Sequence, residues 1–338
     1  MQQPIDRSHL LTTIFNATSA NFDTIAMILF RYQYNYNLVY RSFCDLLHII
    51  PERITTVTQI PFLPILFFKT KAVISTNSLA KFYFESSGTT ATINSKHYVA
   101  DSAVYDESFL ASFKSVYGEV TDWCIVGLLP GYLERKNSSL VYMVNKLIEL
   151  SQNESSGFYL NDYEALALVL KRNESMKQKT LLIGVTFALI DFSKKFATPL
   201  RYTTIMETGG MKGKLKEITR TEVHTIIGKS FGLTHVHSEY GMTELLSQAY
   251  ATAHGKFLPA ATMKILLRSE DDPMDITDAE QLPNAKAGAL NFIDLANIDS
   301  CSFIATDDLG ILHPDGSFEV VGRLDNSDIR GCGLMLIN

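Results

Sequence analysis

The residues that decide the fold class lie at positions 237–244 and read His237-Ser238-Glu239-Tyr240-Gly241-Met242-Thr243-Glu244. The aromatic ring of Tyr240 can stack on a purine, and Gly241 lets the backbone come close to a ligand. The hydroxyl of Thr243 and the carboxylate of Glu244 can supply oxygen ligands near a phosphate-bound magnesium ion. The run therefore has the groups that a nucleotide and its metal require.

A structural alternative exists for the same run. Tyr240 would be a packed aromatic at the start of a helix, and Leu245, Leu246 and Ala249 would form the apolar stripe of that helix. The run alone leaves both interpretations open, so other parts of the chain must decide between them.

A second polar motif follows the strand-like residues Phe82 to Glu85. Ser86-Ser87-Gly88-Thr89-Thr90 combines hydroxyls with a glycine, and successive backbone N–H groups in such a loop can form a nest for an anion. We expect these five residues to bind the polyphosphate of a nucleotide. The loop is not of the Walker type, because no G-x-x-x-x-G-K-[ST] occurs in the chain. An ordinary polar surface turn is the structural alternative.

A third motif lies near the end of the chain. Ala305-Thr306-Asp307-Asp308-Leu309-Gly310 is followed, after a turn, by Gly322-Arg323-Leu324-Asp325. The carboxylate of Asp308 can accept hydrogen bonds from two vicinal hydroxyls, with the guanidinium of Arg323 nearby. Taken alone, Asp315-Gly316 is a hairpin turn, and Arg323 with Asp325 is a surface ion pair.

These motifs, in this order, resemble those of the adenylate-forming superfamily, which contains acyl- and aryl-CoA ligases and acyl-protein synthetases. Residues 240–244 resemble its Y-G-x-T-E motif, and residues 86–90 resemble its phosphate loop. Asp308 matches the aspartate of its T-G-D motif, and Arg323 matches the arginine of its G-R-x-D motif. Order and spacing together are more specific than any one motif.

Three departures from the superfamily pattern stand out. Ala91 follows the paired threonines where glycine is usual, and Asp307 stands where T-G-D has its glycine. The first lysine after the phosphate loop is Lys96, and whether it replaces the usual lysine of that loop stays open.

The resemblance narrows to the acyl-protein synthetase family, the fatty-acid-activating component of the bacterial luciferase aldehyde pathway. It is carried by residues 206–213, 238–250 and 330–332, and it runs from about residue 60 to the C-terminus. The resemblance implies further cofactor-binding residues, which are Gly209, Gly210, Ser238 and Gly241.

The resemblance also implies the architecture. We expect an α/β fold, the large N-terminal domain of an adenylate-forming enzyme, with mixed, largely parallel sheets and a small β-rich subdomain. The small mobile C-terminal domain of the superfamily is expected to be absent, because only 13 residues follow Asp325. Cys332 matches the cysteine that accepts the acyl group in the family. A small buried hydrophobe is its structural alternative.

Strand-like and helical runs alternate along the middle of the chain, which indicates a largely parallel sheet with ligands at the carboxyl ends of its strands. The strand-like runs are Phe82 to Glu85, Trp123 to Leu129, Thr180 to Phe187, Thr203 to Glu207 and Thr234 to His237. The helical runs are Leu140 to Leu150, Asp162 to Asn173, Phe192 to Phe196 and Thr219 to Phe231. Later extended runs are Thr262 to Leu267, Gly288 to Asp294, Ser302 to Thr306 and Ser317 to Val321.

These runs divide the chain into three expected parts. They are a helical N-terminal region at 1–80, an α/β nucleotide- and acyl-binding core at 81–258, and a β-rich subdomain with a hinge-like C-terminal tail at 259–338. The apolar run Ile60 to Phe68 is expected to be buried, with the wall of an acyl pocket as the alternative.

Composition narrows the classes of function. Of the 338 residues, 46% are hydrophobic and 20% charged, which is typical of a soluble globular protein. The net charge of -6, without a basic aromatic-rich run, disfavours a nucleic-acid partner. No apolar run approaches the length of a membrane span. The four cysteines form no C-x-x-C, so we expect neither a zinc site nor a disulfide framework, and a cytoplasmic location fits best.

The expected reaction has two steps. ATP and Mg²⁺ are the expected cofactors, and a carboxylic acid, most simply a fatty acid, attacks ATP to give acyl-AMP and pyrophosphate. Thr243 and Glu244 serve adenylation, with Glu244 as metal ligand, and Cys332 or a thiol of a partner then takes the acyl group. The partner is a reductase, a carrier protein or CoA. A CoA or carrier-protein ligase and a catalytically impaired nucleotide- or acyl-binding protein are the alternatives.

Overall fold

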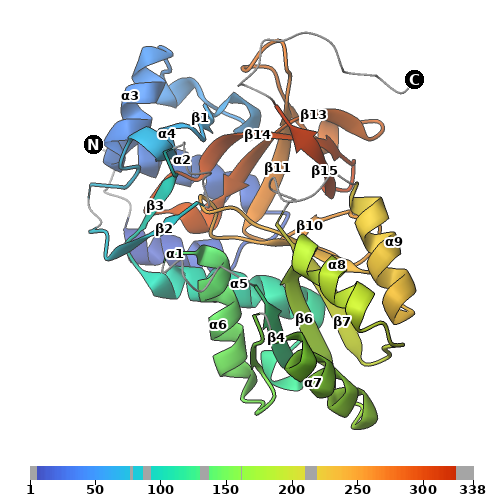
Figure 1. Ribbon diagram of the computed structural model, residues 1–338. Helices are drawn as coiled ribbons and strands as arrows, with labels where there is room; N and C mark the ends of the chain where they lie inside the picture. Colours follow the sequence, from blue (N-terminus) through green and yellow to red (C-terminus); the bar gives the residue numbers. More distant parts are fainter. Residues whose placement is uncertain are drawn as a thin grey trace.

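Two large sheets and one hairpin organise the molecule (Figure 1). The computed structural model describes residues 6–76, 79–86, 93–129, 137–160, 162–209 and 219–324. The hairpin pairs β2 (Phe82–Glu85) with β3 (Lys96–Val99) in antiparallel register.

The seven-stranded sheet has the order β10-β9-β8-β7-β6-β4-β5. Its strands β5, β4, β6, β7 and β8 run parallel, and β9 and β10 add an antiparallel edge. Every residue of β4 and β6 is buried, as expected for parallel strands covered on both faces. The bounds are β4 Cys124–Leu128, β5 Gly157–Phe158, β6 Thr180–Val185, β7 Thr203–Thr208, β8 His237–Tyr240, β9 Ala249–Ala251 and β10 Leu258–Pro259.

Helices cover both faces of this sheet, with α9 on one face and α5 on the other (Figure 1). The helices are α5 Ser102–Tyr117, α6 Ser139–Ser151, α7 Tyr163–Ser175, α8 Thr186–Lys195 and α9 Arg220–Phe231. Side chains at the N-caps Asp101, Ser138 and Asp162 accept hydrogen bonds from free backbone N–H groups of the first turn. Thr219 and Glu222 form a capping box at the start of α9.

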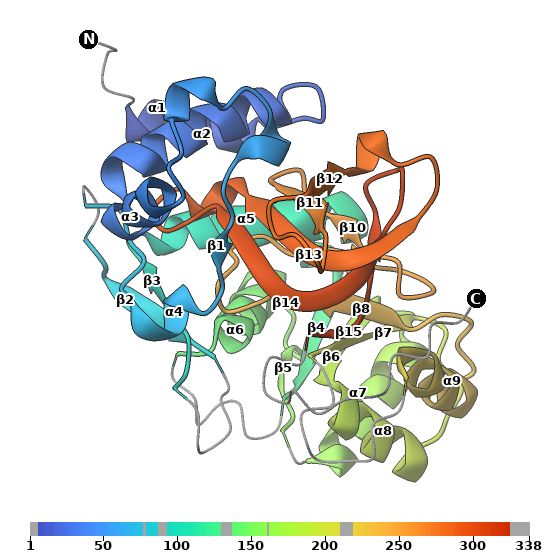
Figure 2. The same cartoon turned by 90° about the horizontal axis from the view of Figure 1, so that it is seen from above.

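The second large sheet has the order β1-β14-β13-β11-β12, with β15 paired to β14. Its bounds are β1 Leu63–Pro64, β11 Met263–Arg268, β12 Ile276–Asp278, β13 Lys286–Asp294, β14 Phe303–Leu312 and β15 Phe318–Arg323. A bulge between Ala289 and Asn291 interrupts the pairing of β13 with β14, and both strands curve strongly (Figure 2). The turn before β15 contains Gly316 at φ +80°, so the hairpin expected at Asp315-Gly316 is present.

The N-terminal helices pack on this second sheet. They are α1 Arg7–Phe15, α2 Phe22–Tyr36, α3 Leu38–Leu46 and the short α4 Phe67–Thr70. Gln33 of α2 donates to the carbonyl of Asn297 (2.8 Å) and accepts from the backbone of Ser302 (2.9 Å). Residues 10–73 therefore share one hydrophobic core with residues after 260, while the boundaries at 80 and 258 stay a prediction.

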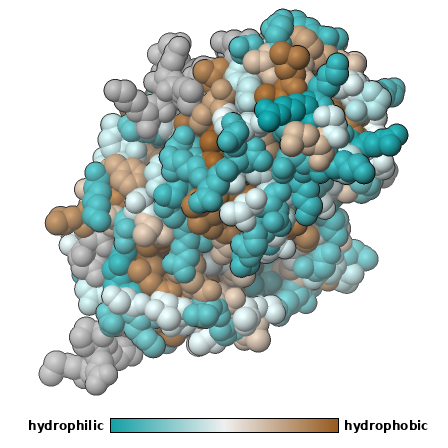
Figure 3. Space-filling view, turned by 90° about the horizontal axis from the view of Figure 1, so that it is seen from below, coloured by the Kyte–Doolittle hydropathy of each residue, from teal (hydrophilic) through white to brown (hydrophobic). Residues whose placement is uncertain are grey.

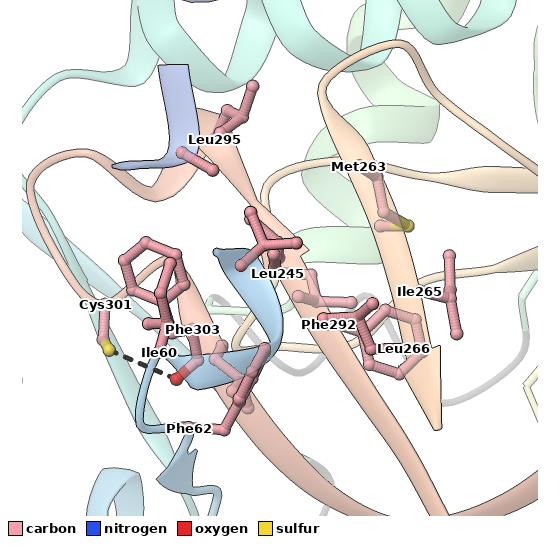
Figure 4. Packing of buried hydrophobic residues seen from close by; sticks show 14 of the residues in the cluster. Ile60, Phe62, Leu245, Met263, Ile265, Leu266, Phe292, Leu295, Cys301 and Phe303 are labelled. Atoms are coloured by element: carbon pink, nitrogen blue, oxygen red, sulfur yellow. Dashed lines mark hydrogen bonds between the residues drawn. The ribbon is translucent and has the colours of Figure 1, made fainter. Parts of the chain in front are cut away.

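The apolar run from Ile60 to Phe68 is largely buried, as expected, although Leu66 is exposed. It supplies β1, which pairs parallel to β14. Figure 4 shows Ile60 and Phe62 beside Phe303 in the interior, and the rings of Phe62 and Phe303 meet edge to face at 6.2 Å.

Several element boundaries differ from the sequence-based expectation, and the strand expected from Ser302 to Thr306, for example, continues to Leu312. The strand expected from Thr180 to Phe187 ends at Val185, because Thr186 already begins α8, which was expected to start only at Phe192. This stretch is mainly apolar, and periodicity alone cannot separate a buried strand from a buried helix. The strand expected to end at His237 instead begins there and continues to Tyr240.

On the face shown in Figure 3, apolar residues form small groups separated by polar side chains. Such scattered apolar exposure is normal for a folded protein surface. Within the described ranges, no helix combines the length and the apolar character that crossing a bilayer requires.

Candidate active site

Tyr240, Asp308 and Arg323 come together between the two large sheets. The Tyr240 hydroxyl donates to Oδ2 of Asp308 at 2.7 Å, and Nε of Arg323 lies 3.0 Å from Oδ1. Asp308 and Arg323 are register partners on β14 and β15. Burial raises the pKa of Asp308, while Tyr240 and Arg323 oppose that rise. Because each carboxylate oxygen can accept more than one hydrogen bond, Asp308 retains capacity for ribose hydroxyls.

The ring of Tyr240 is packed on one side. It stacks on Phe292 at 5.4 Å and 12°, and it meets Phe257 and Phe318 edge to face. Its exposed fraction is 8%. Phe292 occupies one face of the ring, so adenine stacking on Tyr240 stays a prediction that concerns the opposite face.

The residues after Tyr240 form a turn that leads into β9, so the helix of the structural alternative is wrong, although Tyr240 is a packed aromatic as that alternative expected. One buried carboxylate holds this turn. Oδ2 of Asp294 accepts from the backbone of Leu246 (2.7 Å) and Ser247 (3.0 Å), and its Oδ1 accepts from the Ser247 hydroxyl (2.6 Å). Asp294 ends β13, so the second sheet fixes a turn of the first.

Two further side chains fix the carbonyls of the same turn. Nδ1 of His97, on β3, lies 2.8 Å from the carbonyl oxygen of Thr243. Because a carbonyl oxygen only accepts, Nδ1 carries the hydrogen and donates the hydrogen bond. Nδ2 of Asn297 donates to the carbonyl of Glu244 at 2.8 Å. Burial lowers the pKa of His97 to about 4, so the ring is neutral near pH 7. The hairpin that carries the candidate phosphate loop is thereby tied to the 240–244 turn.

Thr243 and Glu244 differ in exposure. Thr243 is half-buried, whereas Glu244 is 5% exposed. Within the described ranges, no group of three or more His, Cys, Asp or Glu side chains is arranged to hold a metal ion. Magnesium usually binds one or two carboxylates together with substrate phosphates, so Glu244 fits such a site. The catalytic and metal-binding roles of Thr243 and Glu244 stay predictions.

The candidate phosphate loop is described only at its first residue. Ser86 follows β2, and its hydroxyl accepts from the backbone N–H of Ser95 at 2.9 Å. The residues predicted to cradle the phosphates, Ser87, Gly88, Thr89 and Thr90, lie outside the described residues. Lys96 lies on β3 rather than in the loop, and its ammonium group is 4.9 Å from the centre of the Tyr83 ring.

The glycines and the serine predicted to bind the cofactor have different environments. Gly209 is exposed at φ +72° directly after β7, whereas Gly210 lies outside the described residues. Gly241 is exposed, and a Cβ there would lie 2.6 Å from Oε1 of Glu239. Ser238 is fully buried, and its hydroxyl donates to Oε1 of Glu207 at 2.8 Å.

Glu207 is the centre of a buried polar network that sequence reasoning did not single out. Its Oε1 lies 2.9 Å from Nε of Arg220 and 3.7 Å from Nε2 of His224, and its Oε2 accepts from Thr186. Burial disfavours its charge, but His224 and Arg220 together hold the pKa of Glu207 below its ordinary value. This network joins β7 to β8, α8 and α9.

The described cysteines are poor nucleophiles. Cys44, Cys124 and Cys301 are all buried. Burial raises the pKa of Cys44 to about 12 and raises the pKa of Cys124 and Cys301 as well. A thiol with a raised pKa supplies little thiolate near pH 7. Cys332, the predicted acyl acceptor, lies outside the described residues.

Comparison with known proteins connects this geometry to a family. The family model described as "Acyl-protein synthetase, LuxE" matches residues 11–338. The long-chain-fatty-acid–luciferin-component ligase of Aliivibrio fischeri is 23% identical over 346 residues, covering 94% of this chain and 88% of that protein.

Solved structures show the same fold. A 2-hydroxyisobutyryl-CoA ligase bound to 2-HIB-AMP and CoA has a TM-score of 0.63 at 12% identity, covering 91% of this chain and 71% of that one. ATP-bound MatB from Rhodopseudomonas palustris has a TM-score of 0.53 at 12% identity over 71% of this chain. The chain spans 47% of the length of MatB, about half. The expected mixed α/β fold of an adenylate-forming ligase is confirmed.

Proposed function

Because the chain belongs to the acyl-protein synthetase (LuxE) family of ligases, we propose that it activates a fatty acid with ATP and then transfers the acyl group to a thiol. The observation that supports this proposal best is the hydrogen bond between Tyr240 and Asp308, which joins the two candidate nucleotide motifs. Tyr240 ends β8 of the parallel part of the first sheet, and the carboxyl ends of such strands are where α/β proteins bind ligands. The name of the Aliivibrio fischeri relative supports a long-chain fatty acid as the substrate.

In the first step a carboxylate oxygen of the acid attacks the α-phosphorus of ATP. The bond to the β-phosphate breaks, pyrophosphate leaves, and acyl-AMP remains. Asp308 and Arg323 hold the ribose, and Tyr240 positions the adenine. Ser86 to Thr90 and Thr243 meet the phosphate oxygens, and the pre-fixed backbone of the 240–244 turn lowers the cost of ordering the site. Glu244 would hold a magnesium ion, which when bound would neutralise phosphate charge.

In the second step a thiol sulfur attacks the acyl carbon, the bond from that carbon to the AMP oxygen breaks, and the thiol proton is released. Cys332 is the acceptor on this chain. The burial and raised pKa of Cys44, Cys124 and Cys301 support this choice, because the described cysteines offer no reactive thiolate. The acyl group passes from there to a reductase, or directly to a carrier protein or CoA.

A second candidate function is a CoA or carrier-protein ligase, in which Cys332 is structural. The structural likeness to a CoA ligase that holds an acyl-adenylate favours this candidate. A catalytically impaired nucleotide- or acyl-binding protein is a third, and Ala91 and Asp307 are the departures that favour it.

The test is covalent labelling with a radiolabelled long-chain fatty acid and ATP. Wild-type protein is expected to carry a label that hydroxylamine removes, as a thioester requires. Cys332→Ser is expected to release pyrophosphate yet carry no label, whereas Cys124→Ser, at a buried cysteine, is expected to be labelled. Labelling of Cys332→Ser at the wild-type level would favour the CoA or carrier-protein ligase.

A further inference from the structure

Glu239 is a buried carboxyl group directly before Tyr240, with one oxygen toward each of two loops of the candidate site. Its Oε2 accepts a short hydrogen bond from the hydroxyl of Thr208, its register partner at the end of β7. Its Oε1 lies beneath Gly241, only 2.6 Å from the position that a Cβ would occupy there. Glu239 therefore lies between Thr208, the last residue of β7, and Gly241 of the 240–244 turn.

Glu239 and Glu207 are neighbours on adjacent strands, but their side chains lie on opposite faces of the sheet. Glu207 faces α9 and is paired with Arg220. Glu239 faces α5 and is 8% exposed. Among the described residues, no lysine, arginine or histidine lies within ion-pair distance of Glu239. The two carboxyl groups thus have opposite electrostatic environments.

The surroundings of Glu239 favour its neutral form. Burial is the largest cause and raises the pKa of Glu239 to about 7, the Thr208 hydroxyl opposes this rise, and the charge of Glu207 adds to it. Gln248 lies on the same side of Gly241, and its Oε1 has no hydrogen-bond partner among the described atoms. The titratable groups on the same face as Glu239 are Tyr105 and Tyr117 of α5, Tyr250 of β9 and His237 of β8, and Glu207 acts from the opposite face of the sheet.

We propose that Glu239 is a positioning residue of the adenylation site, which holds Thr208 and the Gly241 turn together as a neutral acid and weakens the binding of anionic substrates when it ionises. This inference rests on the proposed function, because ATP and a carboxylate are the anions concerned. Gly241 belongs to the turn that carries Thr243, so a negative charge beneath it would lie near the phosphates that this turn is proposed to bind. Buried and without a cation, that charge is poorly screened.

The experiment measures KM for ATP in carboxylate-dependent pyrophosphate exchange between pH 6 and pH 8.5. For wild-type protein we expect KM to rise on the order of tenfold with a midpoint near the pKa of Glu239, and kcat to change much less. ATP itself titrates in this range. The readout is therefore the difference between wild type and variants, not the wild-type profile alone.

Three variants separate the proposed role from a merely structural one. Glu239→Gln is neutral at every pH and is expected to lose the rise in KM. Thr208→Val removes the hydrogen bond that favours the ionised form, so its midpoint is expected to move to higher pH. Thr208→Ser keeps the donor and is expected to retain the wild-type midpoint.

The results distinguish failure of the Glu239 proposal from failure of the proposed function. A Glu239→Gln profile parallel to that of wild type overturns the proposal. If this variant does not fold, the Thr208 pair decides, and a midpoint for Thr208→Val at or below that of Thr208→Ser overturns it. Wild-type protein that shows no pyrophosphate exchange at any pH refutes the proposed function instead, so the two failures are distinguishable.

Discussion

The hydroxyl of Tyr240 donates a hydrogen bond of 2.7 Å to Oδ2 of Asp308, although 68 positions separate the two residues. Tyr240 ends β8 of the mainly parallel sheet, and Asp308 lies on β14 of the second sheet. Arg323 completes the contact from β15. The site therefore depends on the contact between the two sheets. Substitutions at this contact should weaken nucleotide binding more than they slow the chemical step.

Tyr240→Phe tests this contact, since it keeps the ring and removes only the hydroxyl. Loss of one hydrogen bond to a buried carboxylate costs about 1.5 kcal/mol or more, so KM for ATP is expected to rise roughly tenfold. The turnover number should change much less, because nucleotide positioning acts on ground state and transition state alike. Steady-state pyrophosphate release measures both constants. An effect confined to turnover would contradict the assigned role.

Glu244→Gln tests the metal-ligand role. The substitution keeps the shape of the side chain and removes the charge that would hold magnesium, so adenylation is expected to fall about a hundredfold or more. Glu280→Gln is the matched control, because Glu280 is an exposed glutamate between β12 and β13 of the second large sheet. Near-wild-type exchange by Glu244→Gln, with folding confirmed by circular dichroism, would remove Glu244 from the catalytic set.

His97 predicts how stability depends on pH. Burial lowers its pKa from about 6.5 to about 4, so between these values the unfolded chain binds a proton that the folded protein does not. The free energy of unfolding therefore decreases as pH falls from 6.5 towards 4, with a His97 contribution of about 2 kcal/mol between pH 7 and pH 5.

Urea unfolding at pH 7 and pH 5 measures this dependence. His97→Asn keeps a donor near the Thr243 carbonyl but cannot be protonated, so its stability is expected to decrease by about 2 kcal/mol less than that of wild type. His9→Asn, at an exposed histidine, should retain the wild-type dependence. Equal acid sensitivity of all three proteins would show that His97 is not the group that titrates.

The fold could be predicted from the sequence where motif and periodicity agree. The strand from Phe82 to Glu85 and the hairpin turn at Gly316 lie as expected. The strand that ends at Tyr240 was expected three residues too early, at Thr234 to His237, because the polar residues Ser238 and Glu239 do not look like part of a buried strand. Their side chains are satisfied by Glu207 and Thr208 of the neighbouring strand, which no local pattern reveals.

The residues that hold the site were not predictable in the same way. His97, Asp294 and Asn297 each bind the backbone of the 240–247 turn from a distant part of the chain. Histidine, aspartate and asparagine occur at many surface positions, and only the tertiary structure shows that these three are buried and directed at one turn. The nucleotide motif could be recognised in the sequence, but the three residues that hold its backbone in place could not.

The central claim is that the protein forms an acyl-adenylate. The most direct measurement is the exchange of radiolabelled pyrophosphate into ATP, with and without a long-chain fatty acid, because this exchange reports acyl-AMP formation whichever thiol accepts the acyl group. We expect exchange that requires both magnesium and the fatty acid and that Cys332→Ser retains. Tight ATP binding without exchange, across carboxylic acids of short, long and aromatic type, would contradict the claim and favour the nucleotide- or acyl-binding protein.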